Sequence, residues 1–525
     1  MSQGREGAGA EQSSGVRLSE VIAAVSLGAD LGLGQPMEHV LRSCVIATRF
    51  ARHLDVSDDD LETTYWLTLL VTVGCTGVSY ELTPLFGDDI AWRSRWHDVG
   101  PSALSQLRYH LGRAGNDRSP TGRLRVRADL MRTGMRAVQD SLVAHCHVSG
   151  RLGERVGLDP RISDALDQTF TRWDGKGVPR GLGGDRIVLP MQICQMADGI
   201  EVWHREEGVQ GAIDRVRAGA GTFFDPTLVA AWAGAAAAVL ESLGQESSWD
   251  AVITAEPRPR PPLTQPELDA ALEVVADYAD LKSPWFSGHS RGVADLAATA
   301  ARHAGLPEGD VTMLRRAALL HDLGRNGVPN SIWDKPGPLT EAERERVQLH
   351  AYYTDRIVRR AGALAHLAPI ASAAHERAEG SGYPRGIAGD TIPMLGRILE
   401  AADAYHAMLE PRPYRAALSK EAAARELRDM ARAGTLRGDA VDWVLAAAGH
   451  ARRRKPIAPA GLTSREIEVL VRVARGATLR EVGDQLGITP KTAGNHVERI
   501  YSKIGASCRA EATMFAMQHG LLDSM

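Results

Sequence analysis

The sequence predicts an all-α protein, and three observations support this fold class. Apolar residues recur at the three- and four-residue spacing of helices along most of the 525-residue chain, and alternating strand-like runs are few. Aromatic residues, which strands favour, make up only 5% of the chain. The last 65 residues also contain several clear helix-start signals.

Composition narrows the class of protein further. A length of 525 residues predicts three or four domains, and 44% hydrophobic with 24% charged residues is ordinary for a globular chain. The net charge of −4 gives no overall attraction to nucleic acid, so any DNA contact must come from a local surface. No secretory signal is visible, and the longest apolar run, 228–240, is too short to span a bilayer. We therefore expect a cytoplasmic protein with no membrane partner.

The five cysteines are far apart and show no C-x-x-C spacing, which argues against a disulfide framework and a cysteine zinc site and fits a reducing compartment. They are Cys44, Cys75, Cys146, Cys194 and Cys508.

Three segments of biased composition divide the chain. Residues 1–16 are rich in Gly, Ser, Gln and Glu, which predicts disorder. The Pro-rich segment 256–263 cannot continue a helix and predicts a stiff linker. The basic segment 451–460 predicts a second linker, which is either a solvated hinge or a contact to DNA phosphates. The predicted domains are therefore 17–255, 264–450 and 461–525.

The second domain repeats the pattern of the first at two constant offsets, which indicates an internal duplication. In one group, each residue of the second domain lies 250 positions after its counterpart in the first, and in the other group the separation is 205 positions. The aligned residues are His289 with His39, His350 with His145, Asp403 with Asp198, and Gly382–Pro384 with Gly177–Pro179. The change of offset predicts a 45-residue insertion in the first domain, between Ser79 and His145. We call residues 17–255 the first copy, residues 264–450 the second copy and residues 461–525 the tail.

Only the second copy keeps a complete set of groups for metal chemistry. Its His321–Asp322 pair aligns with Val71–Thr72 of the first copy. Imidazoles with a bridging carboxylate suit a dinuclear site, in which two cations about 3.5–4 Å apart promote phosphoester hydrolysis. Mixed His and carboxylate ligands favour Fe, Mn or Zn over Mg or Ca. The first copy is then a domain for pairing or sensing, and His97 in its insertion is predicted to be an ordinary surface residue.

The second copy resembles the HD-GYP phosphodiesterases, a helical, metal-dependent family that hydrolyses cyclic di-GMP. The resemblance covers residues 286–418. It rests on Leu320–His321–Asp322–Leu323–Gly324, Lys335–Pro336–Gly337, His375–Glu376–Arg377, Gly380–Ser381–Gly382–Tyr383–Pro384–Arg385–Gly386 and Arg412–Pro413–Tyr414–Arg415.

The resemblance implies two divalent transition-metal ions and a role for each residue of the pattern. The implied metal ligands are His289, His321, Asp322, His350, His375 and Asp403, with Asp322 as the bridge. Asp322 and Arg325 are the implied catalytic residues, Tyr383 would lie against a guanine, and Arg412 and Arg415 would hold phosphates. Three positions depart from the family pattern: Ala374 replaces one histidine, Trp285 replaces a glutamate and Arg325 replaces a lysine.

Helix-start signals define the architecture of the tail. Two capping boxes, Thr463 with Glu466 and Thr478 with Glu481, and an N-cap at Thr489 predict three successive helices. The apolar face of the third helix comprises Ala493, Val497, Ile500, Tyr501 and Ile504. Its polar face comprises Lys491, Thr492, Asn495, His496, Arg499 and Lys503. A short helix, a turn and a helix with a polar outer face predict a helix-turn-helix unit.

The tail closely resembles the four-helix LuxR-type DNA-binding domain, from Leu462–Thr463–Ser464–Arg465–Glu466 to Gly520–Leu521–Leu522. The resemblance implies DNA contacts from Lys491, Thr492, Asn495, His496 and Arg499, and a homodimer. Ala493–Gly494 stands where the family usually has Val–Lys, which removes one customary DNA contact. The alternative is a small helical bundle that contacts protein, and the helix after Ser507 is predicted to be core or dimer surface.

The combined hypothesis is a transcription regulator whose second copy senses or hydrolyses a cyclic dinucleotide or another phosphoester. Two alternatives remain open: an enzyme whose main role is nucleotide turnover, and an inactive sensor of a nucleotide or metal. The ligand set favours an enzyme, whereas Ala374 and Trp285 favour a sensor.

Overall fold

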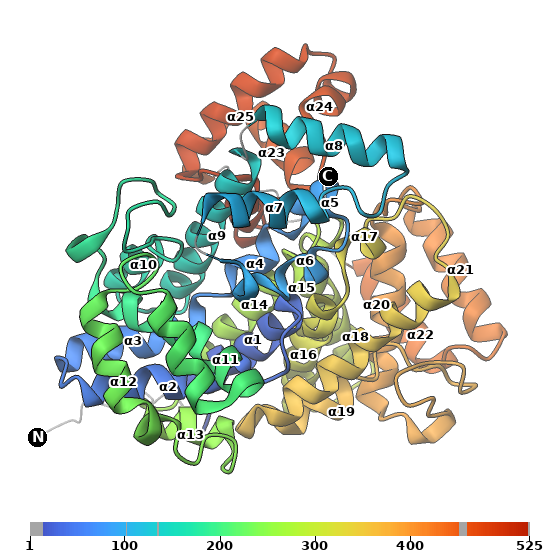
Figure 1. Cartoon of the computed structure of the whole chain (residues 1–525). Coiled ribbons are helices and arrows are strands. Elements are labelled where there is room, and N and C mark those ends of the chain that lie inside the picture. The colour runs from blue at the N-terminus through green and yellow to red at the C-terminus, as the bar shows by residue number, and fades with distance from the viewer. Residues whose placement is uncertain (1–13, 101, 134–135, 451–458, 523–525) are drawn as a thin grey trace, which may run out of the picture.

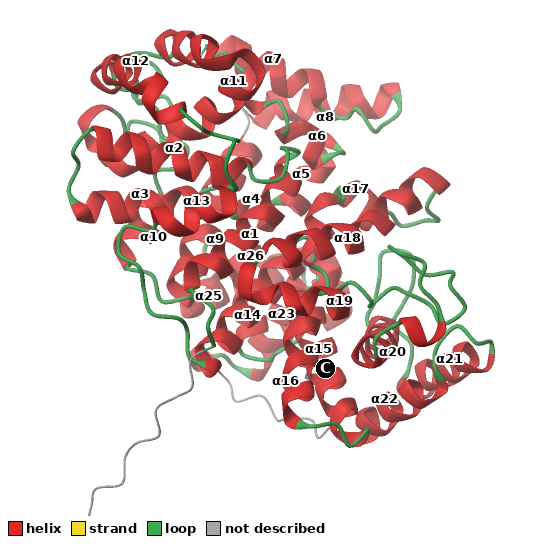
Figure 2. Ribbon diagram, turned by 90° about the horizontal axis from the view of Figure 1, so that it is seen from below, coloured by secondary structure: helices red, strands yellow, loops and turns green. Residues whose placement is uncertain are grey.

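The computed structural model describes residues 14–100, 102–133, 136–450 and 459–522, and these residues are mainly helical (Figure 1, Figure 2). Within these ranges no strand forms, and two isolated bridges, Ala220 with Phe224 and Arg412 with Arg415, are the only β pairings. The predicted all-α class is confirmed.

The first copy consists of helices that surround the long α11, together with an inserted group of helices. The elements outside the insertion are α1 Leu18–Leu33, α2 His39–His53, α3 Asp58–Leu70, α4 Gly74–Gly77, α9 Arg136–Arg155, α10 Pro160–Leu166, α11 Leu189–Ala218, α12 Pro226–Leu240 and α13 Ser248–Ala255. The insertion region contains α5 Ser79–Phe86, α6 Asp89–Arg93, α7 Ala103–Arg113 and α8 Pro120–Thr133. The insertion region has a small core of its own, which includes Phe86, Trp92 and Tyr109.

The second copy repeats the order of the first without the extra helices. Its elements are α14 Gln265–Asp280, η3 Pro284–Phe286, α15 His289–His303, α16 Glu308–Leu320, η4 Leu323–Gly327, α17 Asn330–Trp333, α18 Glu341–Arg360, η5 Gly362–Leu367, α19 Ala368–Ala371, η6 Gly389–Thr391, α20 Met394–Leu409, α21 Lys420–Arg432 and α22 Gly438–His450.

Two close backbone approaches recur in the copies at the predicted offsets. A Cβ on Gly324 would lie 2.0 Å from the His350 carbonyl oxygen, and one on Gly74 would lie 2.1 Å from the carbonyl oxygen of His145. Only glycine therefore fits at either position. The amide of each glycine donates to a hydroxyl on the facing helix, Thr354 at 3.0 Å and Ser149 at 2.8 Å. The duplicated sequence pattern thus corresponds to a duplicated tertiary contact.

The two copies share one hydrophobic core. Buried residues of α1, such as Leu27, and of α14, such as Leu272, belong to the same cluster, and α1 packs directly on η4. The insertion is also anchored in the second copy, because the buried Lys282 ammonium lies 2.9 Å from Asp89 Oδ2. Arg93 pairs with the same oxygen at 2.9 Å. A buried charge is tolerated only when it is paired in this way.

The tail forms four helices, α23 Ser464–Ala474, α24 Leu479–Leu486, α25 Pro490–Ile504 and α26 Arg509–Gln518. Both predicted capping boxes are present, and Thr489 Oγ1 accepts from the Thr492 amide at 3.1 Å. Met517 lies in the core of the tail, whereas Met514 packs against Val148 and Leu281 of the two copies. The helix after Ser507 therefore joins the tail to both copies.

The segments predicted to be disordered or to act as linkers can be compared with the structure only in part. Residues 1–13 and 451–458 lie outside the described residues. Disorder was the wrong prediction for residues 14–16, because Ser14 and Val16 pair with the backbone of Leu263 and Val16 is 2% exposed. The Pro-rich segment 256–263 is not helical, and Arg258 fixes it to Asp59 at 2.7 Å.

Within the described ranges, no single helix has the length and apolar composition needed to cross a membrane, although the bent pair Asp58–Gly77 and Ser79–Phe86 together meets that test.

Candidate functional site

Helix ends and the middles of two helices bring the six predicted ligands together in the second copy. His289 begins α15, His321–Asp322 follow the end of α16, and His350 and Asp403 lie inside α18 and α20. His375 follows α19, and all but this histidine are buried. The α15 terminus is fixed by the buried Asp280, whose carboxylate accepts from the Ser290 amide at 2.9 Å and the Ser290 hydroxyl at 2.7 Å.

The two carboxylate oxygens of Asp322 face different groups of histidines. Oδ2 lies 2.8 Å from His321 Nε2 and 3.4 Å from His289 Nε2. Oδ1 lies 3.4 Å from His350 Nε2 and 3.7 Å from His375 Nε2. The side chains divide into two groups whose ligand atoms lie within 4.8 Å of one another: His289, His321 and Asp403, and Asp322, His350 and His375.

The site fits cations because its buried nitrogen and carboxylate oxygen atoms converge, and Asp322 already pairs with the cationic Arg325. Both Asp322 oxygens and His321 Nε2 are buried without a hydrogen-bond partner among the described residues. His350 Nε2 and His375 Nε2 face each other at 2.8 Å, so two nitrogens point at one place. His321 Nδ1 donates to the Ala318 carbonyl at 2.6 Å and His350 Nδ1 to the Val347 carbonyl at 2.5 Å. These contacts leave each Nε2 lone pair free for a cation.

The electrostatics of the site also favour bound positive charge. Burial opposes a charge on His321, but the neighbouring Asp322 carboxylate outweighs it and raises the pKa of His321 to about 9. Burial and the adjacent His350 lower the pKa of His375 to about 4, which keeps that imidazole neutral. The carboxylates therefore attract positive charge at one end of the site, and neutral nitrogens are available at the other.

The three predicted arginines all have partners within the protein. Arg325 forms an ion pair with Asp322, and its guanidinium carbon lies 4.1 Å from the centre of the Phe286 ring. Arg412 donates to Glu410 Oε2 at 2.7 Å and to the Trp285 carbonyl. Arg415 donates to the backbone carbonyls of Ala407, Met408, Glu410 and Ala416, where it stabilises the end of α20.

The Tyr383 loop lies directly beside the ligands. The Tyr383 ring stacks on the His375 ring with centroids 5.1 Å apart and planes 16° apart. The amide of Tyr383 donates to the His375 carbonyl at 3.0 Å, and the buried Glu376 carboxylate accepts from the Arg385 amide at 2.9 Å and the Ile387 amide at 3.0 Å. Glu376 therefore shapes the loop that presents Tyr383.

In the first copy, the equivalent positions keep the shape but lose three of the six predicted ligands. Phe170 packs edge-on against His145 at 4.9 Å, much as His375 packs against His350 at 4.6 Å, but it offers no nitrogen. His145 Nε2 is occupied by the Val71 carbonyl at 2.6 Å. The Val178 amide donates to the Phe170 carbonyl at 2.8 Å, which repeats the contact of Tyr383.

His97 is not the ordinary surface residue that the sequence predicts. Its Nε2 lies 2.8 Å from Asp198 Oδ2, and its side chain is 15% exposed. Asp198 Oδ1 lies 3.0 Å from His39 Nε2, and His39 Nδ1 lies 2.5 Å from Glu201. A histidine of the insertion therefore contacts Asp198, the aspartate that aligns with Asp403. Sequence spacing gave no signal for this contact, because the insertion has no counterpart in the second copy.

The predicted DNA-contacting face of α25 is accessible. Lys491, Asn495 and Arg499 are exposed, and Thr492 and His496 are partly exposed. Lys503, on the same face, instead lies 2.7 Å from Glu466 Oε2 and supports the α23 cap. Apolar Ala493, Ile500 and Ile504 are buried in the tail core, as predicted.

Comparison with known proteins places these features in a family. Residues 273–436 match the HD domain model, and residues 460–516 match the model described as bacterial regulatory proteins, luxR family. The 3'3'-cGAMP-specific phosphodiesterase 3 of Vibrio cholerae is 32% identical over 413 residues, which cover 76% of this chain and 88% of that relative. The chain belongs to the HD-domain family of cyclic-nucleotide phosphodiesterases.

A second relative and a solved structure support the assignment. A cyclic di-GMP phosphodiesterase of Thermotoga maritima is 37% identical over 161 residues, 30% of this chain and 43% of that relative. The crystal structure of the cyclic GMP-AMP specific phosphodiesterase V-cGAP3 of V. cholerae has a TM-score of 0.57 and 26% identity, and it covers 83% of this chain and 99% of that one. HD-domain phosphohydrolases depend on metals, and this chain joins an HD domain to a LuxR-type tail.

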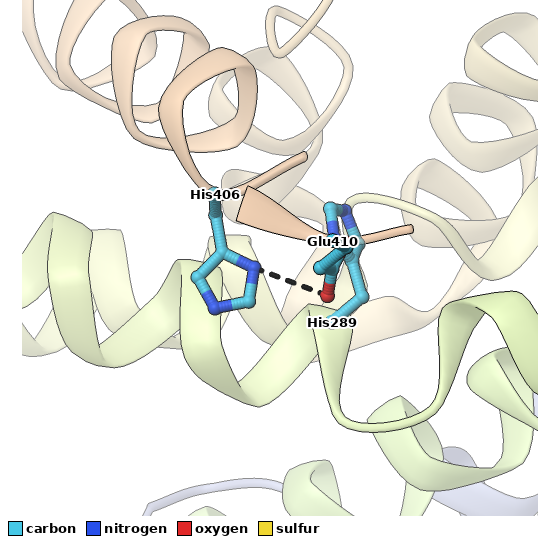
Figure 3. A group of neighbouring side chains, drawn as sticks. All are labelled: His289, His406 and Glu410. Atoms are coloured by element: carbon cyan, nitrogen blue, oxygen red, sulfur yellow. Dashed lines mark hydrogen bonds and ion pairs between the residues drawn. The ribbon is translucent and has the colours of Figure 1, made fainter. Parts of the chain in front are cut away.

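Two residues near the HD-domain ligands were missed at the sequence level. Glu410 Oε2 lies 2.8 Å from His289 Nδ1, and His406 Nδ1 lies 3.3 Å from Glu410 Oε1 (Figure 3). Their i,i+4 spacing at the end of α20 was the available signal.

Proposed function

We propose that this protein is a DNA-binding transcription regulator whose second copy binds two transition-metal ions and hydrolyses a cyclic dinucleotide. The observation that carries the proposal is the position of Asp322, with one carboxylate oxygen toward His289 and His321 and the other toward His350 and His375. One carboxylate with two such faces suits a bridge between two ions.

The ions would be held by the six ligands and would supply Lewis acidity and a hydroxide at neutral pH. The chain's own groups hold that geometry. The Ala318 and Val347 carbonyls orient His321 and His350 through Nδ1. Arg325 adds positive charge beside Asp322, where negative charge develops on a phosphoryl group. The Tyr383 ring, held on His375, offers a surface against which a base can stack.

We propose a 3'3'-linked cyclic dinucleotide as the substrate class. The relative that matches most of the chain is named for 3'3'-cGAMP, and shorter matches are named for cyclic di-GMP. Both molecules present at least one guanine and two phosphodiesters, which are the groups that Tyr383 and the cationic site would bind.

An inactive sensor is the second candidate, because Ala374 leaves the site one histidine short of the HD-GYP pattern. A hydrolysis assay of the purified protein with Mn²⁺ or Fe²⁺ on cGAMP and cyclic di-GMP separates the two. Turnover that Asp322→Ala abolishes and Thr72→Ala leaves unchanged supports the enzyme. Binding without turnover supports the sensor, and neither binding nor turnover contradicts both.

A six-residue segment, 283–288, joins the site to the tail. On the tail side, the Ser287 hydroxyl donates to the Ala474 carbonyl at 3.1 Å, and Pro284 lies against Gly476. On the site side, the Trp285 carbonyl accepts from Arg412 and the Phe286 ring lies under Arg325. The segment ends at Gly288, immediately before the ligand His289. Occupancy of the site and the position of the tail therefore share a physical connection.

Regulation then predicts reciprocal coupling between DNA and nucleotide. Binding of full-length protein to DNA from its own promoter should change at least about 5-fold when cyclic dinucleotide is added, within the usual range of allosteric coupling. Asp322→Ala should abolish this response without abolishing DNA binding. A homodimer, expected of a regulator that binds two half-sites, is tested on the same samples by light scattering. DNA affinity that is unchanged by ligand in wild type would contradict the regulatory part of the proposal.

A further inference from the structure

Glu410 lies on the side of His289 that faces away from the other ligands. The two nitrogens of His289 contact different carboxylates: Nε2 lies 3.1 Å from Asp403 Oδ1, and Nδ1 lies 2.8 Å from Glu410 Oε2. Figure 3 shows the His289 ring beside Glu410, with His406 on the other side of that carboxylate. Glu410 is the residue immediately after α20, so the helix that carries Asp403 also delivers this second carboxylate.

A carboxylate on Nδ1 fixes the state of the imidazole. Glu410 accepts a hydrogen bond from Nδ1–H, which leaves the Nε2 lone pair directed toward Asp322 and Asp403, where a cation would lie. The other buried ligands use backbone carbonyls for this purpose, Ala318 for His321 and Val347 for His350. A carboxylate is the stronger acceptor and also increases the basicity of the ring.

Glu410 also connects the ligand to a predicted phosphate-binding residue. Arg412 Nη2 lies 2.7 Å from Glu410 Oε2, the same oxygen that accepts from His289. The Arg412 guanidinium carbon lies 5.0 Å from the centre of the Phe286 ring, which limits where it can move. His406 is fixed in turn, because a Cβ on Gly292 would lie 2.0 Å from its Nε2. Glu410 Oε2 thus positions both the His289 ring and the Arg412 guanidinium.

The first copy has the same kind of contact, made from a different position. Glu201 accepts from His39 Nδ1 at 2.5 Å and from Arg42 Nε at 2.6 Å. The 205-residue offset aligns Glu201 with His406, one helical turn before Glu410. Both copies therefore place a carboxylate on this nitrogen, although the contributing position differs, and Glu201 provides a matched control in a copy without the complete ligand set.

A metal ion between His289, His406 and Glu410 is the competing explanation, because their ligand atoms lie within 4.8 Å of one another. This arrangement would require His289 to bind cations through both nitrogens and to lose its last proton. A hydrogen bond from His289 to Glu410 leaves His289 as a neutral imidazole.

We propose that Glu410 is a positioning residue of the metal site, which holds His289 in the tautomer that binds metal and holds Arg412 beside it. This inference rests on the proposed dinuclear site in the second copy.

The test is Mn²⁺ binding to full-length, metal-stripped protein, measured by calorimetry for wild type, Glu410→Gln and the first-copy control Glu201→Gln. Glutamine keeps the size of the side chain but is a weaker acceptor. We expect Mn²⁺ affinity to fall about 10- to 100-fold in Glu410→Gln, the usual loss when such an outer partner of a metal ligand is removed. Glu201→Gln should bind Mn²⁺ like wild type.

Thermal unfolding of the metal-free proteins distinguishes positioning from a general loss of structure. Similar unfolding of wild type and Glu410→Gln with weaker Mn²⁺ binding supports the inference. If Glu410→Gln does not fold, Glu410→Asp keeps a carboxylate and should retain more Mn²⁺ affinity than Glu410→Ala. Equal Mn²⁺ affinity of wild type and Glu410→Gln overturns the inference, as does a third ion in wild type that is lost in both Glu410→Gln and His406→Ala. Wild type that binds no Mn²⁺ contradicts the proposed function instead.

Discussion

The two copies have the same local architecture, but the carboxylates at their equivalent sites have different partners. In the second copy, Asp322 and Asp403 face several imidazole nitrogens and fit cations. In the first copy, Asp198 is already paired with His39 and with His97 from the insertion. Burial opposes a charge on His39, but hydrogen bonds to Asp198 and Glu201 raise its pKa to about 10. Because the pKa of the aligned His289 is also raised, the feature that sets the first copy apart is the contact of His97 with Asp198.

This difference shows which features of the duplicated fold are structural. The glycine approaches at Gly74 and Gly324 and the aspartate caps of Asp30 and Asp280 are kept in both copies. They fix helix ends and do not depend on chemistry at the site. The Val71, Thr72 and Phe170 substitutions remove ligands while the surrounding contacts remain.

The largest expected effect comes from removing the bridging carboxylate of the second copy. Asp322→Ala should lower metal content and hydrolysis strongly, because both groups of histidines face this side chain. The loss should exceed the about 100-fold that follows when a residue contacting a metal ligand is removed. Thr72→Ala, at the aligned position, should leave both unchanged. Elemental analysis after gel filtration measures the metal, and equal metal content in Asp322→Ala and wild type would refute the site.

A smaller loss of activity should follow from altering the loop that carries Tyr383. Tyr383→Ala should lower kcat/KM for a cyclic dinucleotide by about 100-fold, since misplacement of substrate alone can cost that much. Metal content should not change, because the ring stacks on His375 without coordinating. Val178→Ala, at the aligned position in the first copy, is the control. Steady-state kinetics on cGAMP and cyclic di-GMP measure the effect, and equal losses in both variants would contradict the difference between the copies.

The raised pKa of His39 predicts a pH-dependent contribution to stability from the first copy. Its pKa is raised from 6.5 to about 10 in the folded state. The stabilisation is therefore complete below pH 6.5 and is lost as the pH rises through about 10. The difference in the free energy of unfolding between wild type and His39→Gln should shrink over this range. Urea unfolding of metal-free protein at several pH values measures it, and a difference independent of pH would argue against a charged His39.

The smallest expected effect concerns the tail, which belongs to neither copy. Lys491→Ala or Asn495→Ala should weaken promoter binding by about 1–3 kcal/mol if the residue contacts a base, and loss of a lysine–phosphate contact should instead reduce the salt dependence. Lys176→Ala, an exposed lysine of the first copy, is the charge-matched control. A salt series of binding measurements on full-length protein separates these outcomes. Unchanged affinity and salt slope in both tail variants would exclude α25 as the DNA-contacting helix.

The sequence by itself determined the helical class, the duplication, the side chains that meet at the candidate site and the start of each tail helix. These features depend on short-range rules. A capping box such as Thr463 with Glu466 involves residues three positions apart, so it forms wherever the helix forms. The ligand positions were likewise visible because the two copies could be aligned with each other.

Only the tertiary structure decided the contacts between residues that are far apart in the chain. His97 reaches Asp198 across 101 positions, and Glu410 reaches His289 across 121. Met514 of the tail packs on Val148 and Leu281. Such contacts depend on how whole helices pack, and the apolar spacing of a helix fixes which face is buried but not which partner covers it. For this reason the sequence could suggest the metal ligands, whereas only the packing showed which residues contact them.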